Sequence, residues 1–350
     1  MNLIQKSIDL FVPFTRVTTS PFPKYYSNEL KNKIIEKKIL QKNFKRFDDS
    51  DFYYEKFKDL RRICKKLLTR DENQYRKTIE SNIIQKPNGF YNYIKSLKDI
   101  NDIPVVMRLD NVVVDNLNDT ANLFASKFGS VYTTSPSNYR NISQIMNNSI
   151  GNIIFTEEEV SNCIDQLSDS LSLGPDGIHM LYVKNCKSVL LGPITNFFNL
   201  SIKLGIYPDL WKKSFVTPTF KNGDVQDVAN YRPIVKICIL AKIFDKLVYE
   251  RLYRYIVGYI IEQQHGFVTE KSTITNLNVF VDDIVYNSCD GYNTDVVFTD
   301  FQRAFDKVNC ETLIQKLAYY GVHGNLLSWF GSMLKGRTQR VRIGNIISTS

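Results

Sequence analysis

The sequence predicts an α+β protein in which a mainly helical, basic region precedes a domain of alternating helices and strands. The first observation is the charge, because residues 1–150 hold 25 Lys and Arg against 16 Asp and Glu, which accounts for the whole net charge of +9. Residues 151–350 hold 20 of each sign. The second observation is periodicity, which is helical in the first part and alternates between helix and strand from residue 156 onward.

Residues 1–26 are expected to form an extended linker, because Pro13, Pro21 and Pro23 oppose regular helix. The chain should then divide into a basic helical region, residues 27–152, and a mixed domain, residues 153–350. The opening apolar stretch is interrupted by charged residues and does not resemble a signal peptide. No apolar run is long enough to span a bilayer, so no membrane partner is expected.

The basic region carries one long amphipathic helix pattern. Its apolar stripe recurs at steps of three and four residues and comprises Tyr53, Phe57, Leu60, Cys64 and Leu67. The cations fall on the remaining surface and are Lys56, Lys58, Arg61, Arg62, Lys65 and Lys66. Such a face can lie along a phosphate backbone, but a solvated helix hairpin has the same pattern. A short helix at 120–128 is expected within the segment 101–152, which otherwise has the composition of loops.

The six cysteines show no CxxC or Cys/His spacing, which argues against a zinc site and a disulfide framework and favours an intracellular protein.

In the mixed domain the expected elements follow in order. Thr156 with three glutamates after it begins a helix. A second helix covers 189–204, a strand covers 214–220 with an Asn-Gly turn after it, and a long amphipathic helix carries apolar residues from Leu240 to Tyr255. The remaining expectations are a strand at 294–299, a helix at 311–320 ended by Gly321, and a hairpin around Gly344-Asn345.

Asp300 stands at the end of the predicted strand and just before a helix pattern. A carboxylate at a strand end can join others to bind Mg²⁺, which prefers oxygen ligands, but it can also cap the next helix. The surrounding pattern D-F-x-x-A-F-D, residues 300–306, resembles the first catalytic motif of reverse transcriptases from non-LTR (LINE-type, jockey-like) retrotransposons. Further blocks resemble the same family in the same order: LGPDGI (173–178), WKKSFVTPTFKNGD (211–224), NYRPI (230–234), QHGF (264–267) and LLSWFGSMLKGRTQRVRIG (326–344).

The resemblance implies an RNA-directed DNA polymerase, a nucleotidyltransferase with the fingers and part of the palm of a right-hand polymerase. Its partners would be an RNA template, a DNA primer and deoxynucleoside triphosphates, in the nucleus or the cytoplasm. The sequence does not indicate an oligomeric state. The family binds two Mg²⁺ ions, with Mn²⁺ as an alternative, and by analogy Asp300 and the Phe301 carbonyl would be ligands.

The same resemblance implies the other site residues. Lys221 and Arg232 would contact the triphosphate, and the backbone at Arg303 and Ala304 would face it. Phe305 would be the steric gate against a ribose 2′-hydroxyl, and Asp306 would orient the helix that follows. Gln264, Gly266 and Phe267 would support the template strand and the packing of the site. Gly174, Pro175 and Gly177 would shape a turn in which Asp176 caps the next helix.

Two positions depart from the family: the residues before GPDGI read SLSL, and NYRPI continues with Val235 and Lys236. The family's later GxPQG and [FY]ADD blocks do not occur in the sequence, and the VDDIV segment (281–285) precedes Asp300 and does not replace them. We therefore expect a fragment of a polymerase that is inactive alone and exposes apolar surface. The alternatives are a non-catalytic RNA- or DNA-binding remnant of a transposable element and, less well matched by the motifs, a group II intron or telomerase-type polymerase.

Overall fold

The structure is a computed structural model and describes residues 2–12, 21–23, 25–44, 50–85, 103–132, 149–169, 173–301 and 303–349. The chain divides into two compact units. The helical unit comprises residues 11–103, and the mixed unit comprises residues 1–10 and 104–350. No helix in the described part of the chain is long and apolar enough to cross a membrane.

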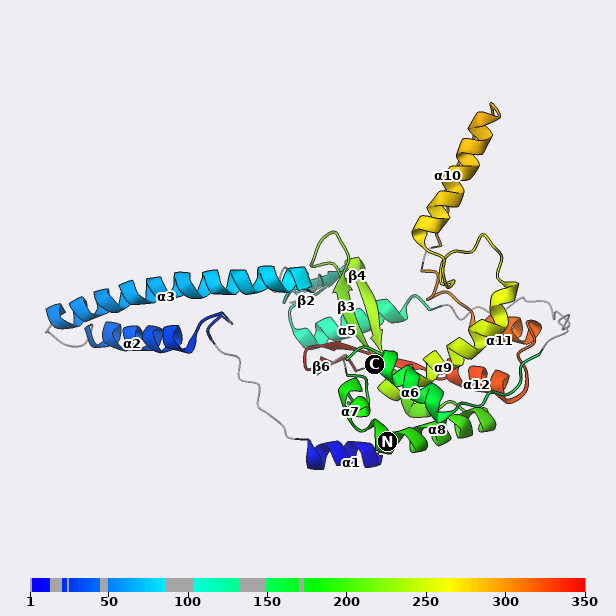
Figure 1. The fold of residues 1–350 in the computed structure, drawn as a ribbon, viewed down its shortest axis with the longest axis horizontal. Helices are drawn as coiled ribbons and strands as arrows, with labels where there is room; N and C mark the ends of the chain where they lie inside the picture. The colour runs from blue at the N-terminus through cyan, green and yellow to red at the C-terminus, as the bar shows by residue number, and fades with distance from the viewer. Residues whose placement is uncertain are drawn as a thin grey trace. The chain divides into compact units, whose positions relative to one another are not determined.

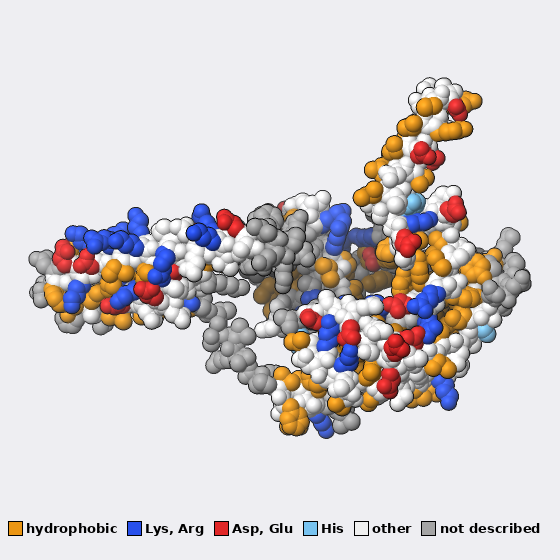
Figure 2. Space-filling model, in the orientation of Figure 1, with side chains coloured by type: hydrophobic (Ala, Val, Ile, Leu, Met, Phe, Trp, Pro, Cys, Tyr) orange, Lys and Arg blue, Asp and Glu red, His pale blue; other side chains and the backbone are white. Residues whose placement is uncertain are grey.

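The helical unit is a hairpin of α2 (Asn28–Phe44) and α3 (Ser50–Gln85), which lie side by side (Figure 1). Its small core contains Leu30 from α2 with Cys64 and Leu67 from α3. The predicted stripe is confirmed, because Leu60, Cys64 and Leu67 are buried and Tyr53 and Phe57 are half-buried. All six predicted cations are exposed, and Figure 2 shows basic side chains gathered along α3. Residues 86–97 of the predicted helical region lie outside the described residues.

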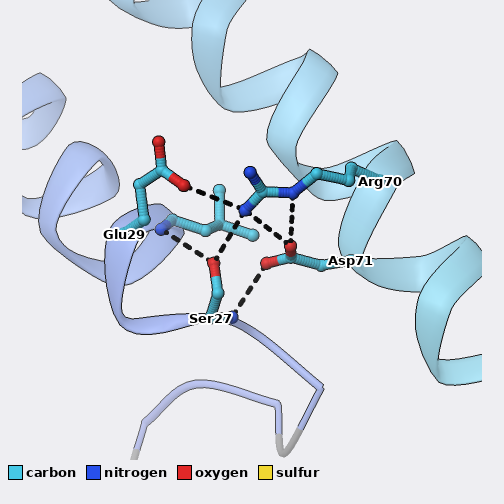
Figure 3. Close-up of polar contacts among 5 residues, drawn as sticks. Ser27, Glu29, Arg70 and Asp71 are labelled. Carbon is cyan, nitrogen blue, oxygen red and sulfur yellow. Dashed lines mark hydrogen bonds and ion pairs between the residues drawn. The ribbon is translucent and has the colours of Figure 1, made fainter.

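A polar network joins the start of α2 to α3 (Figure 3). The Ser27 hydroxyl accepts the Leu30 N–H at 3.2 Å, and the buried Asp71 carboxylate accepts the Ser27 N–H at 2.8 Å. Arg70 donates to Asp71 at 3.1 Å and to Glu29 at 3.0 Å. Burial acts to raise the pKa of Asp71, but the hydrogen bonds from Ser27 and Arg70 outweigh it and lower the pKa.

The mixed unit contains a four-stranded sheet in the order β4-β3-β5-β6. Its strands are β3 (Lys213–Phe220), β4 (Tyr231–Lys236), β5 (Thr338–Ile343) and β6 (Ile346–Ile347). β3 is antiparallel to β4 and parallel to β5, and β5 turns into β6 at Gly344, whose φ of 59° suits glycine. The predicted strand at 214–220 and the predicted terminal hairpin are confirmed. A separate small sheet pairs β1 (Met107–Leu109) with β2 (Val112–Val114).

One side of the sheet is covered by α5 (Leu117–Gly129), which contains the predicted short helix. β3 alternates between buried and less buried residues, and Ser214, Val216 and Pro218 make up the buried set. Phe124 of α5 meets Tyr231 of β4 edge-on, with ring centroids 5.1 Å apart. The sheet therefore has one packed side and one side that α5 does not cover.

The main core lies among helices. They are α6 (Glu157–Gln166), α7 (Met180–Asn185), α8 (Lys187–Leu204), α9 (Ile239–Ile256), α11 (Cys310–Tyr319) and α12 (Gly324–Leu334). Phe244 of α9 stacks on Phe198 of α8 at 4.4 Å and contacts Trp211 and Trp329 edge-on. Aromatic pairs of this kind add about 0.5–1.5 kcal/mol each beyond the burial of their area. The predicted capping box of α6 is confirmed, since Thr156 and Glu159 exchange both hydrogen bonds.

Two expectations are wrong. Residues 2–11 are not an extended linker, because α1 (Asn2–Phe11) is a helix whose Ile4 and Ile8 pack on the main core. The prolines lie beyond Phe11, so they do not oppose this helix. Residues 294–299 are not a strand, and the structure places them in an exposed, irregular segment. An isolated apolar run gains no ladder hydrogen bonds, and none of the described strands pairs with it.

The segment around that run is also exposed. α10 (Thr273–Cys289) has no buried residue and presents apolar side chains such as Ile274 and Leu277 (Figures 1 and 2). The expected apolar surface is thus present at α10 and continues into residues 296–301.

Candidate nucleotide and nucleic-acid site

The hairpin between β3 and β4 positions the two predicted triphosphate cations. β3 ends at Phe220, the Lys221 N–H donates to the Asn230 carbonyl at 2.9 Å, and Arg232 lies opposite Thr219 in the ladder. Lys221 and Arg232 are therefore diagonal neighbours, with Cα atoms roughly 7–8 Å apart. Both are exposed, and neither makes an ion pair within the described part of the chain. They can be approached by one multiply charged anion.

The connection between these strands is rigid for identifiable reasons. Gly223 has a φ of 90°, and a Cβ there would lie 2.8 Å from Asn230 Nδ2, so only glycine fits. Asn230 Nδ2 donates to the Asp224 carbonyl at 3.0 Å, and Asp227 accepts the Ala229 N–H at 2.9 Å. These bonds hold the returning strand and fix where Arg232 emerges.

The GPDG turn packs directly against the segment that follows β4. The Gly177 N–H donates to the Gly174 carbonyl at 3.1 Å, and Gly177 has a φ of 67°. A Cβ on Gly174 would lie 2.5 Å from the Ile237 carbonyl oxygen, so a larger residue cannot approach this closely. Two motifs far apart in the sequence, 173–178 and 230–234, are thus fastened together through Ile237 and Cys238.

Asp176 does not cap the helix after it, contrary to the expectation from the motif. α7 begins after His179, whose side chain makes no capping hydrogen bond. Asp176 instead accepts the Ile178 N–H at 3.3 Å and hydrogen bonds from Cys238 and from the Ile239 N–H at the start of α9. Burial raises the pKa of Asp176, although these hydrogen bonds act in the opposite direction. It also raises the pKa of the Cys238 thiol to about 12, so this thiol is not a nucleophile.

The segment from Asp300 to Phe305 is exposed and irregular apart from a turn. Asp300 is exposed, and the side chains of Phe301 and Phe305 are 86% and 78% exposed. Arg303 has a φ of 55°, the left-handed region that favours glycine, and Ala304 is exposed beside it. The predicted metal ligand and gate are therefore not held by packing.

The structure does bring Phe305 to Phe267. Their rings meet edge-on with centroids 5.9 Å apart, and Phe267 itself has a φ of 63°. Gln264 Nε2 donates to the Gly266 carbonyl at 3.0 Å, which closes the turn before Phe267. The predicted template-support residues and the predicted gate thus form one exposed aromatic contact. No hydrogen bond or ion pair in the described residues joins this contact to Lys221 or Arg232.

The described residues do not form the metal site that the resemblance implies. They contain no group of three or more His, Cys, Asp or Glu side chains able to hold an ion, and Asp300 is thus without companion carboxylates there. One carboxylate does not supply the several oxygen ligands that Mg²⁺ requires. The chemistry open to this arrangement is binding of anions by cations.

Asp306 does not orient α11 by capping it, because Asn309 accepts the Thr312 N–H at 3.0 Å and is the N-cap. Burial raises the pKa of Tyr132, and the negative charge of Asp306 raises it further. Tyr132 donates to Gln339 Oε1 at 3.1 Å, which places the 303–307 turn near the start of β5.

Sequence reasoning missed the cations of β5, Arg340 and Arg342, and gave Lys236 no role. The alternation Thr338, Arg340, Arg342 against the buried Val341 was the available signal, since residues at this spacing share one side of a strand.

Comparisons with known proteins agree with the motif order. Residues 219–348 match the family described as reverse transcriptase (RNA-dependent DNA polymerase). The chain is 29% identical over 202 residues to the probable RNA-directed DNA polymerase from transposon X-element of Drosophila melanogaster, covering 55% of this chain and 21% of that protein. It is 26% identical over 200 residues to the corresponding protein from transposon BS of the same organism, with the same two coverages. It is 28% identical over 156 residues to the RNA-directed DNA polymerase from mobile element jockey, covering 44% and 17%. The chain thus spans about one fifth of the length of these relatives.

Proposed function

From the premise that this chain belongs with the reverse transcriptases of non-LTR retrotransposons, we propose that it forms the fingers and part of the palm of a right-hand RNA-directed DNA polymerase. Its substrates would be deoxynucleoside triphosphates, an RNA template and a DNA primer. The observation that carries the proposal is the β3–β4 hairpin, which presents Lys221 and Arg232 as exposed diagonal neighbours without ion-pair partners in the described residues.

The physical basis is charge and geometry. A triphosphate carries several negative charges, and an Arg side chain can contact phosphate through two parallel hydrogen bonds while Lys supplies a compact charge. A rigid hairpin keeps the two cations at a fixed separation, so little conformational entropy is lost on binding. In this proposal Phe305, Arg303 and Ala304 approach the sugar and phosphates only after the 291–305 segment is packed against a partner strand.

The metal role of Asp300 and the Phe301 carbonyl stays a prediction from the family. A divalent ion would supply charge for the triphosphate and for the leaving group. Because the described residues do not provide companion carboxylates, we expect this chain as given not to extend a primer.

Binding of a fluorescent deoxynucleoside triphosphate to the whole chain tests the hairpin assignment. The double variant K221Q/R232Q should weaken binding by on the order of tenfold or more, since each charged hydrogen bond contributes roughly 1.5–3 kcal/mol. The matched control K203Q/K242Q removes two exposed lysines from α8 and α9 and should bind as the wild type does. Equal affinities in all three proteins would reject the assignment.

A second candidate is a non-catalytic nucleic-acid-binding remnant, favoured by the exposed Asp300 and by the basic face of α3. Primer extension on an RNA template separates the two functions. Extension above that of a D300N control would show catalysis by this chain. RNA binding without triphosphate binding would favour the remnant.

A further inference from the structure

The side of the sheet that α5 does not cover is rich in cations. Residues that lie opposite each other in a ladder share one side of a sheet, and successive residues of a strand alternate between its sides. Phe215, Thr217 and Thr219 of β3 therefore share this side, as do their partners on β4 and β5. We call it the open sheet face, and its members are Lys213, Phe215, Thr217, Thr219, Arg232, Ile234, Lys236, Thr338, Arg340 and Arg342.

Three of these residues form one row across the sheet. Phe215 lies opposite Lys236 of β4 on one flank and opposite Arg340 of β5 on the other. Neighbouring strands are about 4.8 Å apart, so the Cα atoms of Lys236 and Arg340 are separated by roughly 10 Å with an aromatic ring between them. Arg342 lies two residues along β5, with its guanidinium 5.4 Å from the centroid of the Phe215 ring.

Arg342 is held in that position. Its Nε donates to the Gly344 carbonyl at 3.1 Å, so the guanidinium is fixed beside the ring by the β5–β6 turn. Phe215 and Arg342 are both half-buried, whereas Arg340 is exposed. The result is a planar group beside an aromatic ring, flanked by the cations of Lys236 and Arg340.

The charge of this face is not balanced locally. None of the four strands contains an Asp or Glu residue. Lys236, Arg340 and Arg342 take part in no ion pair among the residues that the structure describes. The carboxylate nearest to the face that exerts a resolved effect is Asp209, which pairs with Lys212 and senses Lys213 at the edge of the face. The face therefore attracts an anion that carries several charges.

We propose that the open sheet face binds single-stranded nucleic acid, with Lys236 and Arg340 on its phosphates and the Phe215–Arg342 pair stacking a base. A strand suits the face better than a single phosphate does, because the cations are about 10 Å apart and a stacking platform lies between them. Bases stack on aromatic rings and on guanidinium planes, which an acidic peptide does not exploit.

This surface goes beyond the proposed triphosphate contact. It does not use Asp300 or Lys221, and Arg232 stands at its far end, four residues along β4 from Lys236. The basic Lys236 is one of the positions where the sequence departs from the family pattern, so its role on this face is a property of this chain.

The test is fluorescence anisotropy of a labelled 20-nucleotide RNA, and of a DNA of the same sequence, with the whole chain at several salt concentrations. The variant K236Q/R340Q should weaken binding of at least one strand by on the order of tenfold near 0.1 M salt. The slope of log K against log salt should fall by about 1.4, which is about 0.7 for each phosphate that the variant no longer neutralises. Because the assay requires neither triphosphate nor catalysis, a failed polymerase assignment would leave its outcome unaffected.

Two controls make the result specific. K203Q/K242Q removes the same charge from exposed helix positions and should leave the salt slope unchanged. F215L keeps the charge and an apolar residue but removes the ring, and it should weaken binding with no change in slope. An unchanged slope in K236Q/R340Q for both strands, or an equal change in K203Q/K242Q, would overturn the proposal.

Discussion

The Tyr207 hydroxyl lies 3.1 Å from Oδ1 of Asp245 and links the end of the α8 loop to α9 inside the main core. Tyr207 is fully buried and contacts Trp211 and Trp329 edge-on. Burial raises the pKa of Asp245 to about 6, although the hydrogen bond from Tyr207 and the charge of Arg337 act to lower it. A carboxyl group in the core thus titrates close to neutral pH.

This relationship predicts a pH-dependent stability. An unfolded Asp has a pKa of about 3.9, so between about pH 4 and pH 6 the folded chain binds more protons than the unfolded chain. The contribution of Asp245 to the free energy of unfolding should therefore fall by on the order of 1–2 kcal/mol as the pH rises through this window. In D245N this contribution should disappear, and denaturant unfolding at pH 4.5 and 7 measures the difference. The same pH dependence in both proteins would contradict the assignment.

The Ser27–Asp71 network predicts the opposite dependence in the helical unit. The pKa of Asp71 is lowered in the fold, so its contribution is present above about pH 4 and is lost as the pH falls through the folded pKa. D71A should speed hydrogen exchange of the α2 and α3 amides and cost about 2 kcal/mol at neutral pH. E36A removes only an exposed ion pair in the same hairpin and should change exchange little. Equal protection in D71A and the wild type would count against the network.

The close approach at Gly174 predicts a sharp difference between two glycines. G174A would place a Cβ 2.5 Å from a backbone oxygen, which cannot move without shifting the start of α9, so it should cost about 1–3 kcal/mol. G129A meets no atom within 4 Å at the end of α5 and should be neutral or slightly stabilising. The melting temperatures of the two variants decide the point, and equal values would contradict the packing described.

Two phenylalanines should differ strongly despite their common chemistry. F244A removes a ring from the aromatic core and should cost about 3–5 kcal/mol, measured by denaturant unfolding. F305A removes a ring that is 78% exposed and should cost less than about 0.5 kcal/mol. A large loss of stability in F305A would mean that the 300–305 segment is packed more firmly than the structure shows.

The sequence predicted those elements whose signal is local. The capping box at Thr156 and the stripe from Tyr53 to Leu67 both come from neighbouring residues, and both are confirmed. α1 is harder to predict, because Lys6 and Asp9 interrupt its apolar stretch and conceal that Ile4 and Ile8 lie on one side of a helix.

Non-local relationships could not be read from the sequence. The strand expected before Asp300 requires a pairing partner, and no described strand supplies one. The hydrogen bonds of Asp176 to the start of α9, and the row of Lys236, Phe215 and Arg340, depend on chain segments that meet only in the fold. Motif order predicted the family, while the packing between motifs came from the structure.

The most direct test of the central claim locates the bound triphosphate. A photoreactive deoxynucleoside triphosphate is crosslinked to the whole chain, and the labelled peptides are identified by mass spectrometry. We predict label within residues 213–236, absent in K221Q/R232Q and retained in K203Q/K242Q. Label confined to other peptides, or label in the hairpin that persists in K221Q/R232Q, would contradict the assignment of this hairpin as the triphosphate-binding element of a reverse transcriptase.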